Sequence, residues 1–230
     1  MKNRRLIRIY WMLLILGIAS FFSLFILTGT GYFGEMPEFE QLENPNTNLA
    51  TQIISSDGEI LGKYYFNDNR TPITYQELPT NLVNALIATE DERFYSHPGI
   101  DIRSTIRAIV FLNRRGGAST ISQQLARQLF VGVRSRNFVQ AILQKAKEWV
   151  LALQIEKRYT KNEIIAMYLN IYDFGNNADG VRSASKIYLN KTPDSLLIED
   201  AAMLVGMLKN SSLYNPRRRP ELVLERRNVV

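Results

Sequence analysis

Residues 79–99 read PTNLVNALIATEDERFYSHPG, and this stretch decides the fold. It predicts an amphipathic helix after Pro79, because small or apolar side chains recur at spacings of three and four: Leu82, Ala85, Leu86 and Thr89. The helix ends at the acids 90–92, before Pro98-Gly99 forces a turn. A carboxylate there can reach into a cleft, although an acidic run alone is more typical of a solvated helix end. His97 alone is likewise more often structural than catalytic.

More helical patterns follow this stretch. They cover 101–113, 119–130, 137–158, 161–171, 180–189, 198–209 and 220 onward. Thr160 and Glu163 form a capping box for 161–171, and Asp179 is the expected cap of 180–189. Strands and helices do not alternate as a parallel sheet requires, so the sequence predicts a mainly α domain over 79–230.

Upstream of Pro79 the pattern changes. We predict a linker over 31–50, because residues 35–50 are polar, contain Pro37 and Pro45 and show no steady period. In region 51–78, short apolar stretches flank Asp57-Gly58, a dipeptide that tolerates the backbone of a tight turn. We therefore expect a small β-hairpin there.

The N-terminus resembles a membrane anchor. Residues 9–27 are almost wholly apolar, and as a helix they span roughly 28 Å, about one hydrocarbon core. We predict a cytoplasmic tail over 1–8 and a transmembrane signal anchor over 9–30, with the following domain exported because the basic residues stay inside. A cleaved signal peptide is the alternative, but its apolar region is usually shorter.

Composition narrows the function classes. The 230 residues include no cysteine and a single histidine, which excludes thiolate and multi-histidine metal sites. The net charge is +6, but four of the basic residues precede the anchor: Lys2, Arg4, Arg5 and Arg8. Basic and aromatic residues do not interleave as on a nucleic-acid surface, so we predict no nucleic-acid partner.

Residues 116–130, GGASTISQQLARQLF, contain a second candidate site. A glycine pair precedes a helix start at Ser119 and Thr120, where hydroxyl and backbone N–H groups favour anions. Polar side chains then share one helix face: Ser119, Gln123, Gln124 and Arg127. Such a face is usually plain surface, but beside a glycine loop it is also typical of phosphate sites.

Lys145 and Glu148 lie three residues apart on the helix predicted over 137–158 and are neighbours there. By itself this spacing indicates an ordinary surface ion pair, which contributes little stability. A reaction would explain all three regions together. A carboxylate can deprotonate an attacking hydroxyl, and a diphosphate leaving group needs cations and hydrogen-bond donors but no proton. A glycosidase that expels an alkoxide would also need a proton-donating carboxylic acid.

Five segments in order resemble the motifs of the peptidoglycan glycosyltransferase domain of class A penicillin-binding proteins, glycosyltransferase family 51. They are EDERFYSHPG (90–99), GGASTISQQLARQ (116–128), LQKAKEWVLALQIE (143–156), KNEIIAMYLNIYDFG (161–175) and MLKNSSLYNP (207–216). The joint match favours the catalytic interpretation over the surface alternatives above.

The resemblance implies roles for particular residues. Glu90 would deprotonate the 4-hydroxyl of an acceptor lipid II, which attacks the donor with inversion and releases polyprenyl diphosphate. Glu148 would organise the diphosphate site, directly or through a divalent cation such as Mg²⁺. The substrate-binding positions implied are Ser119, Thr120, Gln123, Gln124, Arg127 and Lys145, and of these Gln124, Arg127 and Lys145 match positions that contact the diphosphate.

The resemblance also implies a fold and a location. The fold would be lysozyme-like, with a partly membrane-embedded lobe between the second and third motifs. The enzyme would be a single-pass protein of the bacterial cytoplasmic membrane with an extracytoplasmic catalytic domain. Its partners would be lipid II, the growing glycan chain, membrane lipid and other cell-wall synthesis proteins.

Two positions depart from the family pattern. Gln144 stands where the third motif usually has arginine, and Gln128 replaces the usual asparagine. Lys147, Arg134 and Arg136 are the candidates to replace the missing positive charge.

Two other functions stay open: a lysozyme-like enzyme that cleaves finished glycan, and an inactive anchor that recruits other wall enzymes. Residues 183–186 match the S-x-x-K pattern of transpeptidases, but no S-x-N or K-T-G partner follows, which indicates a chance match. The chain ends inside an expected helix, which suggests that its parent continues into a transpeptidase domain.

Overall fold

The computed structural model describes residues 2–34, 36–37, 51–58, 60–64, 71–111 and 117–230. Its first helix, α1 (Lys2–Gly29), contains most of the predicted 9–30 span. Within it, Arg4–Gly29 is long and apolar enough to cross a membrane. Most of the linker predicted over 31–50 lies outside the described residues.

The predicted hairpin is confirmed. Strands β1 (Thr51–Ile54) and β2 (Ile60–Tyr64) pair antiparallel, with an irregularity in register between Ile53 and Ile54. Gly58 takes a positive φ of 89° in the connection, and its N–H bonds the carbonyl of Ser55 at 3.0 Å. That backbone conformation is why Gly is favoured at this point of the turn.

The rest of the described chain is helical, as predicted. The helices are α3 (Thr80–Glu90), α4 (Ile102–Val110), α5 (Ile121–Ala126), α6 (Phe138–Arg158), α7 (Lys161–Ile171), α8 (Gly180–Ala184), α9 (Ile198–Leu208) and α10 (Pro220–Val229). Single 3₁₀ turns lie at Tyr75–Glu77, Phe94–Ser96 and Pro193–Ser195. This mainly α architecture is consistent with a lysozyme-like domain.

Two predicted helices are not regular throughout. The pattern over 119–130 forms α5 and then a π turn, Arg127–Val131, while that over 180–189 forms α8 and a π turn, Ser185–Leu189. The first π turn closes with a bond from Gly132 N–H to the Arg127 carbonyl at 2.8 Å. Apolar periodicity does not distinguish these wider turns from an α-helix.

The predicted caps were right for one helix and wrong for another. Thr160 and Glu163 form the expected capping box of α7. Asp179 stands at the N-cap of α8, but its side chain makes no capping hydrogen bond. The α8 entry is instead set by Gly180, which has a positive φ of 77° and lies against the Asn170 carbonyl.

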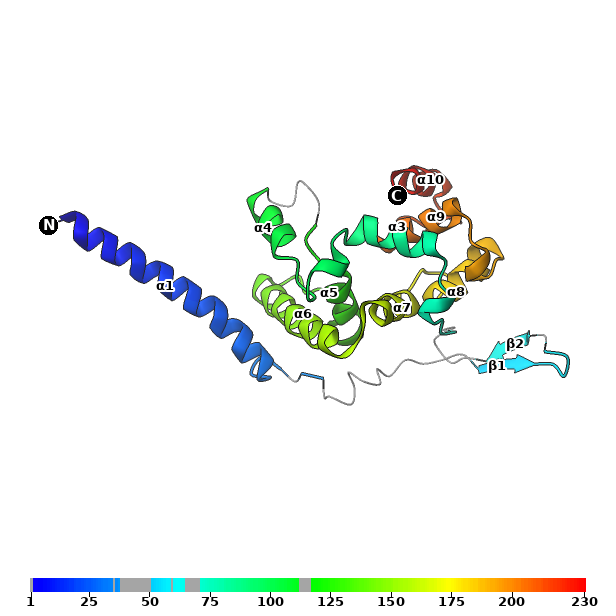
Figure 1. The fold of residues 1–230 in the computed structure, drawn as a ribbon, viewed down its shortest axis with the longest axis horizontal. Coiled ribbons are helices and arrows are strands. Elements are labelled where there is room, and N and C mark those ends of the chain that lie inside the picture. The colour runs from blue at the N-terminus through cyan, green and yellow to red at the C-terminus, as the bar shows by residue number, and fades with distance from the viewer. Residues whose placement is uncertain (1, 35, 38–50, 59, 65–70, 112–116) are drawn as a thin grey trace.

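Helix α5 lies at the centre of the domain, between α6 and α7 (Figure 1). Its Ile121 and Leu125 are fully buried. The largest buried side chains around them come from α3, α6, α7 and the turn after α3: Leu82, Leu86, Phe94, Leu151, Ile155, Ile164 and Tyr168. This core fixes the end of α3, the start of α5 and the middle of α6 relative to one another.

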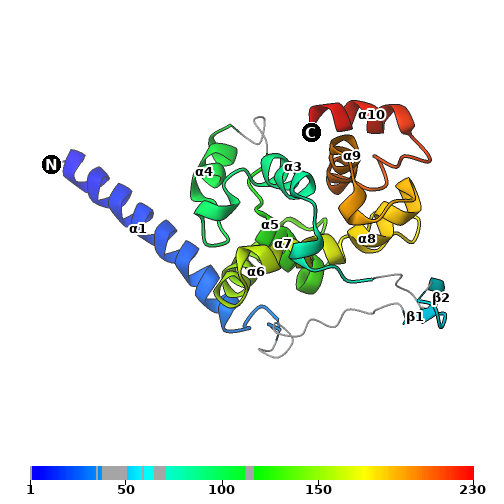
Figure 2. The same cartoon turned by 45° about the vertical axis from the view of Figure 1, so that its right-hand side comes forward.

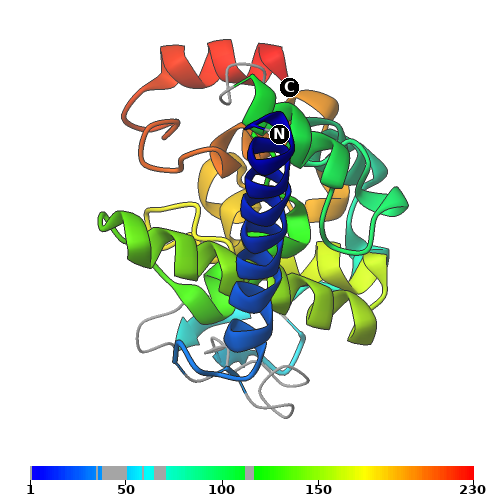
Figure 3. The same cartoon turned by 90° about the vertical axis from the view of Figure 1, so that its left-hand side faces the viewer.

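Two further contacts shape the molecule. Helix α9 packs against both α3 and α10, so that α10 covers the edge of the domain far from the hairpin (Figures 2 and 3). The C-terminal end of α1 packs against α6 while the rest of α1 projects away (Figure 1). The Phe25 ring stacks on Trp149 with 5.4 Å between centroids.

Candidate active site

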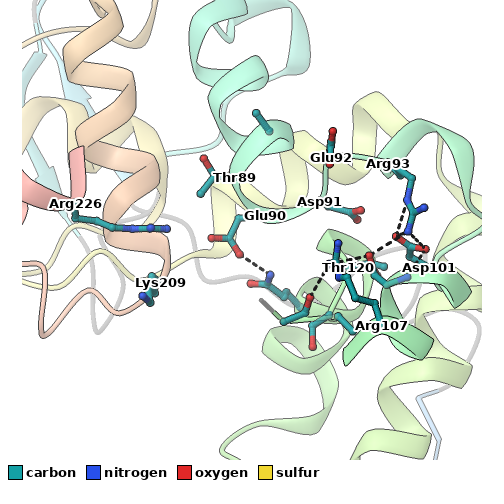
Figure 4. A pocket seen from close by; sticks show the side chains of 16 residues that line it. Thr89, Glu90, Asp91, Glu92, Arg93, Asp101, Arg107, Thr120, Lys209 and Arg226 are labelled. Carbon is teal, nitrogen blue, oxygen red and sulfur yellow. Dashed lines mark hydrogen bonds and ion pairs between the residues drawn. The ribbon is translucent and has the colours of Figure 1, made fainter. Parts of the chain in front are cut away.

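A cleft of about 710 Å³ opens where α3 ends (Figure 4). Its walls are the segment 88–93, the start of α4, the segment 117–120 and, from the far end of the chain, Lys209 and Arg226. Glu90 is the last residue of α3 and lies on this wall. The sequence-based expectation that a helix end presents Glu90 to a cleft is therefore realised in the structure.

The Glu90 side chain is held by a chain of hydrogen bonds. Gln124 Nε2 donates to Glu90 Oε2 at 2.8 Å, and the hydroxyl of Tyr168 donates to Gln124 Oε1 at 2.9 Å. Because the Tyr168 bond occupies the amide oxygen, the amide NH₂ group is the end that faces Glu90. Gln124 was expected at the diphosphate, but here it contacts the candidate base.

Tyr168 is suited to be a permanent donor. Its side chain is fully buried, and burial, followed by the negative charge of Glu90, raises the pKa of its hydroxyl well above the usual value. The phenol therefore stays protonated over the working pH range. Burial also raises the pKa of the neighbouring Tyr172 to about 12.

Two polar residues that follow Glu90 in the chain, Asp91 and His97, stabilise the loop after α3. Asp91 is buried and accepts from His97 Nε2 at 3.0 Å and from the Ile121 backbone N–H at 3.1 Å. His97 Nδ1 in turn accepts from Gly99 N–H at 3.1 Å, which assigns the proton to Nε2. His97 thus has the structural part expected for it.

The start of α5 differs from the predicted anion site. Its Ile121 N–H is bound by Asp91, and its Gln123 N–H is bound by the Thr120 hydroxyl at 3.2 Å. The same hydroxyl donates to the Gly99 carbonyl at 2.6 Å, and Thr120 is 1% exposed. Two of the N–H groups at this helix start are therefore occupied within the chain, and Asp91 is the anion bound there. The anion-binding role of this helix start stays a prediction.

The positively charged part of the site is centred on Lys145 of α6. Lys145 Nζ contacts three oxygens: Ser119 Oγ at 3.0 Å, Gln123 Oε1 at 3.1 Å and Glu148 Oε2 at 2.8 Å. Glu148 is only 5% exposed, so the pair is not the surface ion pair of the alternative interpretation. Since Ser119 also lines the cleft, it connects this centre to the Glu90 wall.

The surroundings of Lys145 disfavour its charged form. Burial lowers the pKa of its ammonium group, Glu148 opposes that shift, and the positive charges of Arg127 and Arg134 add to it. Arg127 and Arg134 thus add positive charge around Lys145, and Glu148 is the carboxylate that pairs with Lys145 among the described residues. An additional anion would be bound favourably at this point.

A divalent cation at Glu148 stays a prediction. In the described part of the chain, no three His, Asp or Glu side chains lie together as a protein-built metal site requires. Glu148 is already paired with Lys145 at 2.8 Å. The donor set therefore does not fit a metal held by this chain alone.

Sequence reasoning missed three cations on the cleft wall: Arg107, Lys209 and Arg226. Figure 4 shows Arg226 extending from α10 toward Glu90, with Lys209 below it. Arg226 Nε is buried without a hydrogen-bond partner among the described residues. The motif 207–216 includes Lys209, but only the packing of α9 and α10 reveals that both residues line the same cleft as Glu90.

Arg93 and Asp101 close the other end of the cleft. Arg93 Nη2 lies 2.6 Å from Asp101 Oδ2. Burial raises the pKa of Asp101, but hydrogen bonds from the Ser104 backbone and from Arg93 outweigh it and bring the pKa down to about 2. Asp101 is thus an ion-pair partner at any working pH and not a proton donor.

The S-x-x-K match has no site geometry. Ser183 is buried within α8, while Lys186 is exposed in the π turn after it. This arrangement agrees with a chance match.

Comparison with known proteins identifies related chains. A family profile described as Transglycosylase matches residues 57–230. Penicillin-binding protein 1A of Escherichia coli is 37% identical over 200 residues, which is 85% of this chain and 23% of that protein. Penicillin-binding protein 1F of Bacillus subtilis is 35% identical over 187 residues (80% and 25%), and penicillin-binding protein 2a of Streptococcus pneumoniae is 42% identical over 160 residues (70% and 21%). The chain thus spans about a quarter of the length of these relatives.

Proposed function

Because this chain belongs to the transglycosylase family, the peptidoglycan glycosyltransferase domain of class A penicillin-binding proteins, we propose that it polymerises lipid II into glycan strands. The proposal is supported by one observation above all: the site contains a candidate base and, apart from it, a positively charged group. A carboxylate, Glu90, is positioned by Gln124, and Lys145 of α6 lies apart from it with the positive charges of Arg127 and Arg134 nearby. A base and an anion site together fit sugar transfer from a diphosphate.

Glu90 acts as the general base in this proposal. Its carboxylate takes the proton of the acceptor's 4-hydroxyl as that oxygen attacks the anomeric carbon of the donor. The bond from that carbon to the diphosphate oxygen breaks with inversion, and polyprenyl diphosphate leaves with the electron pair. Gln124 holds the carboxylate toward the cleft through its 2.8 Å bond. Positioning of this kind is a large part of general-base catalysis.

Lys145 and Arg127 bind the diphosphate, with Ser119 and Gln123 as neighbouring hydrogen-bonding groups. Glu148 holds Lys145 in place at 2.8 Å and so organises this site. Diphosphate leaves as an anion, so the step needs charge stabilisation and no acid.

The cleavage alternative is supported less well. A glycosidase of the two-carboxylate type needs a proton-donating acid near the leaving oxygen. Asp91 is engaged with His97 and Ile121, and Asp101 is paired with Arg93. Of the acids that line the described cleft, these two are therefore committed to structure.

The apolar surfaces fit a membrane enzyme. We propose that α1 crosses the bacterial cytoplasmic membrane with its basic N-terminus inside, which places the catalytic domain outside. Next to α1, the start of α6 and the loop before it expose large apolar side chains: Val133, Phe138, Val139 and Ile142. This surface would rest on membrane lipid, where the polyprenyl chains of the substrate are held. The growing glycan chain and other cell-wall synthesis proteins are the further partners of the proposal.

The test is polymerisation of purified lipid II by the full chain in detergent or vesicles. Glu90→Gln keeps the shape of the side chain but removes the base, and we expect glycan synthesis to fall at least about 10³-fold. Glu92→Gln, an exposed neighbour, is the matched control and should retain activity. Normal turnover by Glu90→Gln would remove Glu90 from the mechanism. Shortening of finished glycan without polymer formation would favour the cleavage alternative.

A further inference from the structure

The loop before α6 is clamped to that helix by one side chain. Gln144 Oε1 accepts from the Ser135 N–H at 2.7 Å, and Gln144 Nε2 donates to the Val133 carbonyl at 3.1 Å. The two bonds fall on the residues immediately before and after Arg134. One amide thus fixes the backbone on both sides of an arginine.

Further bonds make the clamp rigid on its C-terminal side. Ser135 Oγ donates to Gln140 Oε1 at 2.7 Å and accepts from the Asn137 N–H at 3.1 Å. Asn137 then caps α6 through bonds from the Val139 and Gln140 N–H groups. The segment from Ser135 onward is therefore continuous with the helix that carries Lys145.

Packing does not hold this loop. Val133 is 93% exposed, and Arg134 is exposed as well. Hydrogen bonds from Gln144 are thus the main contacts that decide where the Arg134 backbone lies. The chemistry of an amide suits this task, because it offers an acceptor and a donor from one planar group. An arginine in the same place could not accept from the Ser135 N–H, and a glutamate could not donate to the Val133 carbonyl.

The clamp directs a charge toward the cation cluster. Gln144, whose amide bonds the residues on both sides of Arg134, directly precedes Lys145 on α6, so the clamp places the Arg134 backbone beside this part of the helix. In agreement with this placement, the positive charge of Arg134 lowers the pKa of Lys145, as the charge of Arg127 does. Bringing a third cation to a buried lysine is unfavourable unless an anion occupies the site. The arrangement therefore fits a ligand with more than one negative charge.

We propose that Gln144 is a positioning residue that holds Arg134 beside Lys145, so that Arg134 supplies a cation to the diphosphate of the substrate. This inference rests on the proposed function. Gln144 does not bind the diphosphate itself; it acts through the loop that it clamps.

The kinetic effect should fall on substrate binding. The diphosphate is charged before the reaction as well as in the transition state, so a loop cation binds both states alike. For Arg134→Gln we expect KM for lipid II to rise about tenfold, as for the loss of one charge-assisted hydrogen bond, with little change in kcat. Arg134→Lys should retain most of the affinity. Arg136→Gln, in the same loop but outside the Gln144 clamp, is the matched control.

A double-mutant cycle tests the positioning role. Gln144→Ala should raise KM by a similar factor, and the Gln144→Ala, Arg134→Gln double variant should be no worse than Arg134→Gln alone. Gln144→Ala should also leave the thermal midpoint nearly unchanged, because the loop is exposed. A variant that moves the positive charge is a further test. Gln144→Arg in the Arg134→Gln background should recover part of the lost affinity, since it places a cation on α6 next to Lys145.

Three results would overturn the inference. An unchanged KM in Arg134→Gln would show that Arg134 supplies no cation. Losses that multiply in the double variant would show that Gln144 does not act through Arg134, and an equal loss in Arg136→Gln would show a general surface-charge effect. A wild-type chain that makes no polymer from lipid II would instead remove the proposed function, and this inference with it.

Discussion

Tyr168 fixes the orientation of the Gln124 side-chain amide. An isolated glutamine side chain can turn either its oxygen or its nitrogen toward a neighbour. The buried phenol donates to Gln124 Oε1, which leaves the NH₂ group for Glu90 Oε2. The candidate base is therefore oriented by a residue that does not touch it.

We expect Tyr168→Phe to lower kcat by about tenfold, since the amide is then free to rotate and Glu90 loses a fixed donor. The measurement is steady-state lipid II polymerisation, with the thermal midpoint as a check on folding. Tyr172→Phe is the matched control, because the Tyr172 hydroxyl binds the carbonyls of Met207 and Leu208 instead. That variant should lose stability but keep kcat. Equal kcat losses in both would contradict the orienting role of Tyr168.

The sequence predicts single residues well where the partner is near in the chain. Lys145 and Glu148 were predicted as a pair from their spacing, and they lie 2.8 Å apart. The contacts of Gln124 with Glu90 and Tyr168 were not predicted, because they join residues that lie 34 and 44 positions apart in the chain. Helical periodicity carries no information about such distant partners.

At the scale of elements, the entry into α8 depends on Gly180. Its φ is +77°, and a Cβ there would lie 2.5 Å from the Asn170 carbonyl oxygen. The backbone of α7 cannot move away without disturbing the buried Tyr168 and Leu169. Both the conformation and the close approach therefore require glycine.

We expect Gly180→Ala to destabilise the chain by about 3 kcal/mol or more, from left-handed strain and a backbone clash together. Gly132→Ala separates the two causes, because Gly132 has a φ of +75° with nothing within 4 Å of its built Cβ. Its ψ of -150° places Gly132 in a backbone region that is essentially restricted to glycine, so that control should cost about 2 kcal/mol from backbone strain alone. Thermal and denaturant unfolding in detergent give both values. Similar losses for the two variants would show that the contact with Asn170 adds nothing.

Helix boundaries were predicted where a local sequence signal sets them and were missed where the packing of distant segments sets them. The bounds of α7 were predicted to the residue, because the Thr160–Glu163 capping box is written in the local sequence. The π turns Arg127–Val131 and Ser185–Leu189 were not predicted. Their apolar residues keep a helical spacing, and the extra residue per turn is set by how the neighbouring helices pack.

On the scale of the whole molecule, packing assembles the cleft from both halves of the chain. The α9 helix packs on α3 and α10, and this brings Lys209 and Arg226 to a wall that Glu90 shares. Gly206 permits the approach, since its built Cβ would already lie 3.1 Å from Arg226 Cγ. The sequence predicted α9 and α10 but not that their basic residues face α3, because that depends on tertiary contacts alone.

A specific contact joins α1 to α6, the helix that carries Lys145 and Glu148, and it yields a last prediction. Phe25 of α1 stacks on Trp149, the residue after Glu148, and Thr28 is fully buried one turn later. A stacked aromatic pair adds about 1 kcal/mol beyond the area that it buries. We therefore expect Phe25→Ala to lower the thermal midpoint in lipid nanodiscs by a few degrees and to slow polymerisation.

Phe22→Ala is the control for this contact, because Phe22 lies on the same helix but is 61% exposed and meets no residue of α6 in a ring contact within the described chain. Its thermal midpoint and rate should match those of the wild type. If the two variants behave alike, α1 acts only as a tether that keeps the domain at the membrane. If only Phe25→Ala is impaired, the position of α6, with Lys145 and Glu148 on it, depends on the anchor.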